Sequence, residues 1–140
     1  MSDPRAAGVP ADLLFLVLSA VLCLAQALPY SHGLMLRPEV MRGGLGDRGL
    51  GEGLTGWAAR ARRSHVNMVE SLVPFAVLLL ATHAAGRGGR LSALGAETFF
   101  AARLLHAVCA LAGLAWGRKV AWHLSLFGAA LVLLALCFPT

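Results

Sequence analysis

Charged residues are scarce in this sequence. Only 14% of its 140 residues are Asp, Glu, Lys or Arg, whereas 58% are hydrophobic. Soluble domains contain about 25% charged and about 45–50% apolar residues, and a soluble protein of this length could not bury so much apolar surface. The imbalance excludes an ordinary soluble domain and predicts a single domain, residues 1–140, whose main solvent is lipid.

The sequence also lacks the patterns that indicate a metal site or a nucleic-acid site. Its three cysteines, Cys23, Cys109 and Cys137, lie in apolar runs without CxxC spacing, so we expect small buried side chains and no metal ligands. The net charge of +5 is not gathered into basic runs interleaved with aromatic residues, which argues against nucleic-acid binding. Residues 44–49 fit GxGxxG, but no predicted strand precedes them, so a dinucleotide site is not expected.

Long apolar runs make up most of the remaining sequence. Four of these runs are long enough to cross a bilayer as helices of about 20 residues. They cover residues 11–32, 60–84, 92–116 and 120–138. The intervening residues 33–59 are rich in glycine and predict a loop. The sequence therefore predicts an all-α integral membrane protein, an up-and-down four-helix bundle with one long loop.

The first apolar run has a second interpretation, a cleaved signal peptide. Ala25-Gln26-Ala27 resembles the small-residue cleavage site that follows a short apolar stretch. The first twelve residues, however, contain Asp3, Arg5 and Asp12 in place of a positively charged region. We therefore expect this run to remain as a membrane span.

The distribution of basic residues predicts the orientation in the membrane, because Lys and Arg near the span ends favour the cytoplasmic side. Eight basic residues lie on the side of the long loop: Arg37, Arg42, Arg48, Arg60, Arg62, Arg63, Arg118 and Lys119. Three lie on the other side: Arg5, Arg87 and Arg90. We expect a multi-pass protein of the cell membrane with loop 33–59 in the cytoplasm and both termini outside.

Polar residues inside the second and third runs are the candidate functional residues. Arg63, Asn67 and Glu70 are spaced by four and three residues, which places them on one face of a helix. Arg103 and His106 share a face of the third run in the same way. Ionisable groups at membrane depth are costly and usually face the bundle interior, so they indicate a functional site. We expect Glu70 and Arg103 to form a buried ion pair.

These polar residues allow a structural and a functional interpretation. In the structural one, Arg103 and Glu70 only hold two helices together, and Asn67 forms an interhelical hydrogen bond. A functional site is favoured because Arg63, Asn67 and His106 accompany a pair that would need none of them. The set then predicts a cationic pocket for a small anion with several carboxylates.

Two motifs connect these residues with a known family. Residues 63–75, RSHVNMVESLVPF, resemble the RxxxNxxE…PF signature of the MAPEG family, the membrane-associated proteins of eicosanoid and glutathione metabolism. The segment 103–106, RLLH, resembles that family's RxxH, and the whole four-span plan is similar to that of a bacterial-type member. The resemblance implies a homotrimer that binds glutathione between subunits, near the cytoplasmic side, and takes lipophilic small molecules from the membrane lipid.

The resemblance also implies which residues hold glutathione. The positions carried over are Arg37, Arg63, Asn67, Glu70, Arg103 and His106. Arg37 corresponds to a basic residue that a neighbouring subunit contributes. Arg103 and Lys119 are the implied catalytic residues, and Lys119 lies near a position that family enzymes use as Arg. A lysine there lacks the two-pronged donor geometry of arginine.

One position departs from the family pattern. Glutathione-using members usually place a Tyr one helical turn after RxxH, and this sequence has Ala110 there; its only tyrosine is Tyr30. Losing a phenol that donates to the glutathione sulfur would cost about 10²-fold in rate. Two functions therefore stay open. One is a glutathione-dependent transferase or peroxidase acting on lipophilic electrophiles, which is the function we favour, and the other is a non-catalytic lipid-binding or scaffold protein of the same fold.

Overall fold

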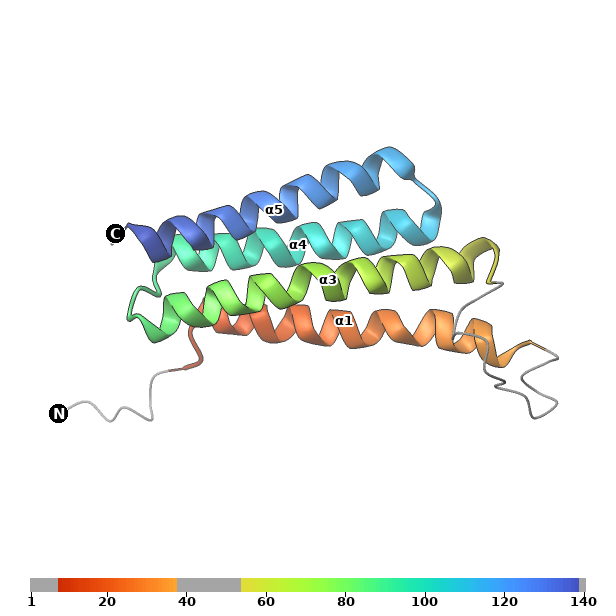
Figure 1. Cartoon of the computed structure of the whole chain (residues 1–140), viewed down its shortest axis with the longest axis horizontal. Coiled ribbons are helices and arrows are strands. Elements are labelled where there is room, and N and C mark those ends of the chain that lie inside the picture. Colours follow the sequence, from red (N-terminus) through yellow and green to blue (C-terminus); the bar gives the residue numbers. More distant parts are fainter. Residues whose placement is uncertain (1–7, 38–53, 139–140) are drawn as a thin grey trace.

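The computed structural model describes residues 8–37 and 54–138, and nearly all of them are helical. The helices are α1 (Ala11–Met35), α3 (Gly56–Ala84), α4 (Arg90–Ala112) and α5 (Ala115–Cys137). They lie side by side and alternate in direction along the long axis of the molecule (Figure 1). The predicted all-α, up-and-down four-helix bundle is confirmed, and the GxGxxG segment falls outside the described residues.

All four helices are long and apolar enough to cross a membrane. Their outer faces expose large apolar side chains, among them Leu24, Leu28, Val77 and Phe127. In water such a surface would be strongly unfavourable, whereas lipid tails solvate it. The chain is therefore a multi-pass membrane protein.

The third and fourth helices separate earlier than predicted. We expected the third span to reach residue 116, but α4 ends at Ala112 and α5 begins at Ala115. Gly113 ends the helix with φ of 79°, a left-handed conformation that glycine adopts without strain. The resulting turn is short and brings the start of α5 next to the end of α4.

Close packing between α4 and α5 depends on two facing glycines. A Cβ added to Gly95 would lie 2.7 Å from the Gly128 carbonyl oxygen, and one added to Gly128 would lie 2.7 Å from the Gly95 oxygen. Small residues at such positions let membrane helices approach closely. Nearby, the rings of Phe75 and Phe99 stack with their centroids 3.8 Å apart and link α3 to α4 in the core.

Candidate functional site

Arg103 is completely buried on α4, between α4 and α3. Its Nη2 donates a hydrogen bond to Asn67 Oδ1 at 3.0 Å, and its Nε donates to the sulfur of Met68 at 3.2 Å. Its Nη1 is also buried and has no hydrogen-bond partner among the described residues. A buried cation without a compensating anion is costly, which makes Arg103 a candidate for binding an anion rather than for packing.

The predicted ion pair between Glu70 and Arg103 is wrong. Glu70 is exposed on α3, and the described residues contain no ion pair between it and Arg103. The reason is the rotation of α3: both Asn67 and Met68 face Arg103. Met68 lies about 100° to one side of Asn67 and Glu70 about 60° to the other, so the side of α3 that faces Arg103 leaves Glu70 exposed.

A cavity of about 200 Å³ lies beside this buried arginine, between α3, α4 and α5. We call it the cationic cavity; it is lined by Asn67, His106, Arg118, Lys119, Trp122 and His123. Its lining contains two permanent cations and no carboxylate. Asn67 also accepts the hydrogen bond from Arg103, so the buried guanidinium lies directly behind the wall of the cavity.

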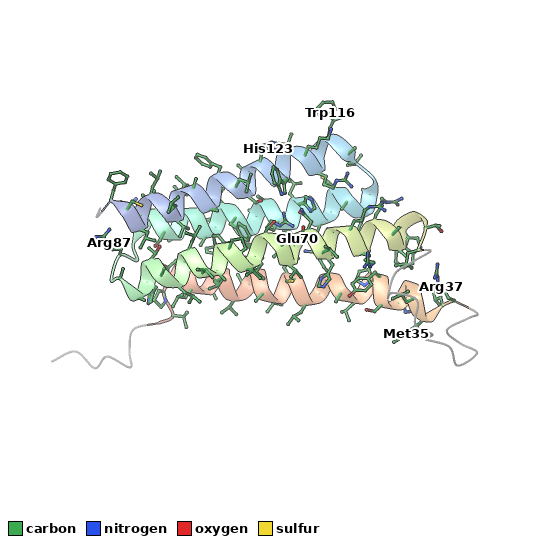
Figure 2. The ribbon with its side chains drawn as sticks, in the orientation of Figure 1. Met35, Arg37, Glu70, Arg87, Trp116 and His123 are labelled. Carbon is green, nitrogen blue, oxygen red and sulfur yellow. The ribbon has the colours of Figure 1, made fainter. Side chains whose placement is uncertain are left out.

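Two contacts on α5 hold the basic side of the cavity in place. The Lys119 ammonium lies 5.0 Å from the centre of the Trp116 ring, a cation–π contact that limits where the lysine can point. One turn later, His123 Nδ1 is hydrogen-bonded to the carbonyl oxygen of Lys119 at 2.8 Å. Figure 2 shows Trp116 and His123 along the same helix.

His106 lines the cavity and is itself buried. Only 4% of its surface is exposed, and its Nδ1 has no hydrogen-bond partner within the described part of the chain. Two buried nitrogen atoms without partners therefore belong to His106, which lines the cavity, and to Arg103, which contacts the lining residue Asn67. Buried polar groups are nearly always hydrogen-bonded, so the pair indicates a place for a polar ligand.

The structure brings together four of the seven residues that the sequence singled out: Asn67, Arg103, His106 and Lys119. The other three do not line the cationic cavity in this single chain. Arg63 and Glu70 are exposed on α3, and Arg37 lies just beyond the end of α1 (Figure 2). Their part in ligand binding stays a prediction.

Three residues of the cationic cavity were missed by sequence reasoning: Arg118, Trp122 and His123. Arg118 was counted only as a charge that sets orientation. His123 follows Lys119 by four residues and Trp122 follows Arg118 by four, so helical spacing would have placed them on the side of the known basic residues. Their proximity to α3, however, follows from the packing of α5 and not from its sequence.

Ala110 is buried in the bundle, with 2% of its surface exposed. It lies one turn after His106 on the inward face of α4. A tyrosine at this position would have to displace packed neighbours. Overpacking of this kind lowers the stability of a protein by about 1–3 kcal/mol. Introducing the missing phenol is therefore a poor test of activity in this chain.

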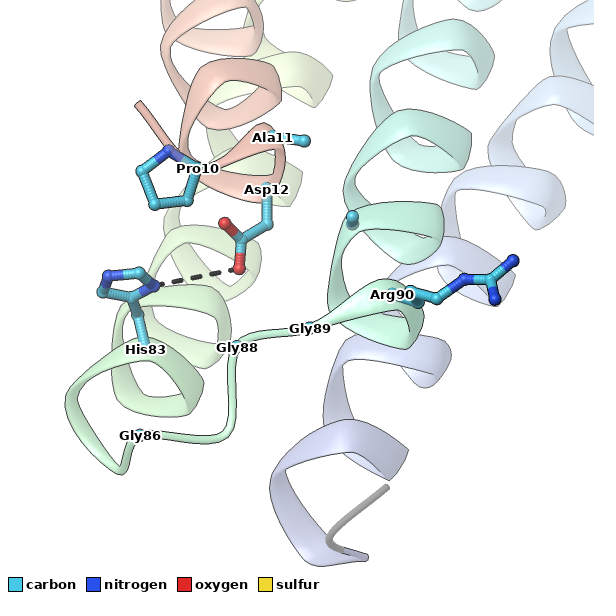
Figure 3. Close-up of a pocket in the computed structure, with 9 residues that line it drawn as sticks. Pro10, Ala11, Asp12, His83, Gly86, Gly88, Gly89 and Arg90 are labelled. Atoms are coloured by element: carbon cyan, nitrogen blue, oxygen red, sulfur yellow. Dashed lines mark ion pairs between the residues drawn. The ribbon is translucent and has the colours of Figure 1, made fainter. Parts of the chain in front are cut away.

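A second cavity, of about 480 Å³, lies at the opposite end of the bundle. We call it the Asp12 cavity, and Figure 3 shows its lining: Pro10, Ala11, Asp12, His83, Gly86, Gly88, Gly89, Arg90 and Ala93. Asp12 is buried, yet Oδ1 accepts from the Leu13 amide at 2.9 Å and Oδ2 accepts from the Ser92 hydroxyl at 2.9 Å. His83 Nδ1 lies 3.9 Å from Oδ2. These contacts tie α1 to α3 and α4, so the burial of Asp12 is explained by its role in the fold.

Comparison with known proteins agrees with the motifs. No curated protein and no solved structure matches the chain. The model of the MAPEG family matches residues 9–138, a range that contains all four helices and every residue lining the two cavities. The match covers far more than half of the sequence, and we conclude that the chain belongs to the MAPEG family.

Proposed function

We propose that the cationic cavity binds glutathione and that the protein is a glutathione-dependent transferase or peroxidase acting on lipophilic electrophiles. The observation that carries the proposal is a buried Arg103 with a partnerless donor, next to a cavity lined by Arg118 and Lys119 and by no acid. Such a site favours a small polyanion, because every carboxylate it takes up offsets a charge that nothing in the described chain neutralises. Glutathione, with its two carboxylates, fits this requirement.

The residues of the cavity divide the binding task between them. Arg118 and Lys119 supply cationic donors for the carboxylates. Asn67 uses its Oδ1 to accept from Arg103, which leaves its amide hydrogens available to a ligand in the cavity. Arg103 in this scheme fixes the orientation of Asn67 and adds positive charge from behind.

The size of the cavity supports an assembly of several chains. Ligand sites usually measure about 300–1,000 Å³, whereas the cationic cavity encloses about 200 Å³. One chain therefore holds part of the ligand, and a neighbouring subunit of a homotrimer would complete the site. Arg37 is the residue that we expect the neighbour to contribute.

The chemistry follows from charge and location. Bound glutathione supplies a thiol, and nearby cations favour the thiolate, which is the nucleophile. The cavity opens among helices whose outer faces are apolar, so a lipophile reaches it from the membrane. It lies toward the α4–α5 turn, because Arg118 and Lys119 follow the start of α5 at Ala115. From the distribution of basic residues we expect this end to lie in the cytoplasm.

Calorimetry of the purified protein in lipid nanodiscs tests the glutathione site. The wild type should bind glutathione, and the double variant Arg118→Gln/Lys119→Gln should bind it about 10²-fold more weakly, since each charged hydrogen bond contributes about 1.5–3 kcal/mol. The matched control Arg87→Gln/Arg90→Gln removes the same charge at the other end and should bind like the wild type. Equal affinity in the wild type and the cavity variant would refute the site.

Turnover separates an enzyme from a binder. An enzyme conjugates a lipophilic electrophile or reduces a lipid hydroperoxide at the expense of glutathione, and loses this activity in the cavity variant. Buried Ala110, which replaces the usual tyrosine, favours the second function, a non-catalytic lipid-binding or scaffold protein. Glutathione binding without product from either substrate would establish that function.

A further inference from the structure

The cationic cavity contains groups that stabilise a thiolate, but few that can form one. Arg118 and Lys119 are already protonated, so they attract negative charge without removing a proton from a thiol. Asn67 is an amide and is not a base. The imidazoles of His106 and His123 are the remaining candidates in the lining.

His123 has the geometry of a proton acceptor. Its Nδ1 is 2.8 Å from the carbonyl oxygen of Lys119, and a carbonyl oxygen can only accept a hydrogen bond. The hydrogen of the neutral ring is therefore on Nδ1, and Nε2 retains its lone pair. No described residue is hydrogen-bonded to Nε2, and the side chain is exposed at the cavity.

His106 lacks these features. It is buried, and its Nδ1 has no partner among the described residues that would fix its tautomer or its orientation. A side chain that faces the cavity with one nitrogen anchored and the other unused is better placed to exchange protons with a ligand. His123 is such a side chain, and it comes from α5 and not from α4, where the absent tyrosine would lie.

We propose that His123 is a catalytic residue whose Nε2 accepts the proton of the glutathione thiol. The inference rests on the proposed glutathione site. In this step the S–H bond breaks, an Nε2–H bond forms and the electron pair stays on sulfur. The new positive charge on His123 arises together with the negative charge on sulfur, and its Nδ1 keeps the bond to Lys119.

Each of the three helices that line the cavity contributes polar or charged groups around His123. Lys119 and Arg118 come from α5, His106 from α4, and Asn67 from α3, with Arg103 behind it. None of them is a carboxylate, so no acid in the lining competes with the thiolate for the imidazolium. His123, as a base next to fixed cations, can therefore promote the thiolate in place of the tyrosine that is absent at Ala110.

The thiolate itself provides the test, because its ultraviolet absorbance reports deprotonation without any lipophilic substrate. We compare the wild type with His123→Gln, whose side-chain amide has a similar reach but is not a base, across a pH titration with saturating glutathione. In the wild type the thiolate forms near neutral pH. In the variant its midpoint moves toward that of a free thiol, about pH 8.5, while the Kd for glutathione changes by less than about threefold.

A matched control and a second variant keep the test decisive. His32→Gln removes an exposed histidine at the end of α1 and should titrate like the wild type. If His123→Gln does not fold, His123→Ala with added imidazole replaces it, and the free base should restore part of the thiolate signal. We expect kcat to fall by about 10²-fold with KM nearly unchanged.

The outcomes separate this inference from the proposal beneath it. If the wild type and His123→Gln both bind glutathione and give the same thiolate titration, His123 is not the proton acceptor and the glutathione site stands. If the wild type binds glutathione without forming thiolate, the inference fails in the same way. If the wild type binds no glutathione, the proposed function fails together with the inference.

Discussion

Each end of the bundle buries a charged side chain, Asp12 at one end and Arg103 at the other, and the two differ in their hydrogen-bond partners. Asp12 has a hydrogen-bond donor on each carboxylate oxygen, and the contacts join three helices. Arg103 is just as buried, but it has two neutral acceptors, a partnerless Nη1 and no acid nearby in the described chain. The larger cavity is at the Asp12 end.

This contrast indicates that the number of hydrogen-bond partners of a buried charged group is a better guide to function than the volume of the cavity beside it. A charge with all its partners stabilises the fold, and removing it leaves those partners unpaired. A charge without partners costs stability and persists only if something else binds it.

The largest effect is expected from Arg103→Met. An unbranched apolar side chain fills much of the same space, so glutathione affinity should fall by about 10²-fold or more as the positive charge behind the cavity and the anchor of Asn67 are lost. The free energy of unfolding should stay the same or rise, because replacing a buried charge by a hydrophobe is often neutral or stabilising. Calorimetry and detergent-induced unfolding measure the two quantities.

Arg62→Met is the control for this variant, because Arg62 lies on α3 and does not line the cationic cavity. Its glutathione affinity should match that of the wild type. Marked unfolding of Arg103→Met would contradict the contrast, since it would make Arg103 a structural residue like Asp12.

Asp12→Ala should show the reverse pattern. The Ser92 hydroxyl and the Leu13 amide lose their acceptor, which should lower the free energy of unfolding by about 2 kcal/mol. Glutathione affinity should not change, because the cationic cavity is at the other end of the bundle. A weaker Kd in a folded Asp12→Ala protein would show that the two ends are coupled.

Lys119→Gln should weaken glutathione binding by about tenfold, which corresponds to one partly exposed charge–charge contact of about 1.4 kcal/mol. The loss should shrink as salt is added, because salt screens exposed charges. Lys119→Arg should bind at least as tightly as the wild type, since a guanidinium offers a carboxylate two donors. An arginine variant as weak as the glutamine variant would argue against a carboxylate at this position.

The smallest effect belongs to His83→Gln. Its Nδ1 lies 3.9 Å from Asp12, and its side chain is 41% exposed, so solvent screens the contact. We expect a loss of about 0.5 kcal/mol or less in the free energy of unfolding, and no change in glutathione affinity. A loss as large as that of Asp12→Ala would mean that the histidine, and not Ser92, satisfies the buried acid.

The sequence predicted the helices well because hydropathy acts along the chain. All four spans lie where the apolar runs are, and the main error, the boundary between α4 and α5, comes from the left-handed Gly113. The loop boundaries were also too wide, since α1 continues to Met35 and α3 already begins at Gly56.

The site was harder to predict, for a physical reason. Helical spacing gives the angles between Asn67 and Glu70 but not the absolute rotation of α3, which the packing of Met68 and Phe75 in the core determines. For this reason Asn67 was predicted correctly as a partner across the helices and Glu70 was paired with Arg103 wrongly. His123 was missed because its proximity to α3 depends on how closely α4 and α5 approach at Gly95.

The turn at Gly113 also limits how this protein can vary. It links α4 to α5 with only two residues, so the chain allows little freedom in the position of Lys119 relative to His106. An inserted residue would change the geometry of this turn and shift the basic side chains of α5 relative to His106. The segment that links α1 to α3 is much longer and runs from residue 36 to residue 55. We therefore expect insertions between homologues to accumulate in the long loop and to be rare in the short turn.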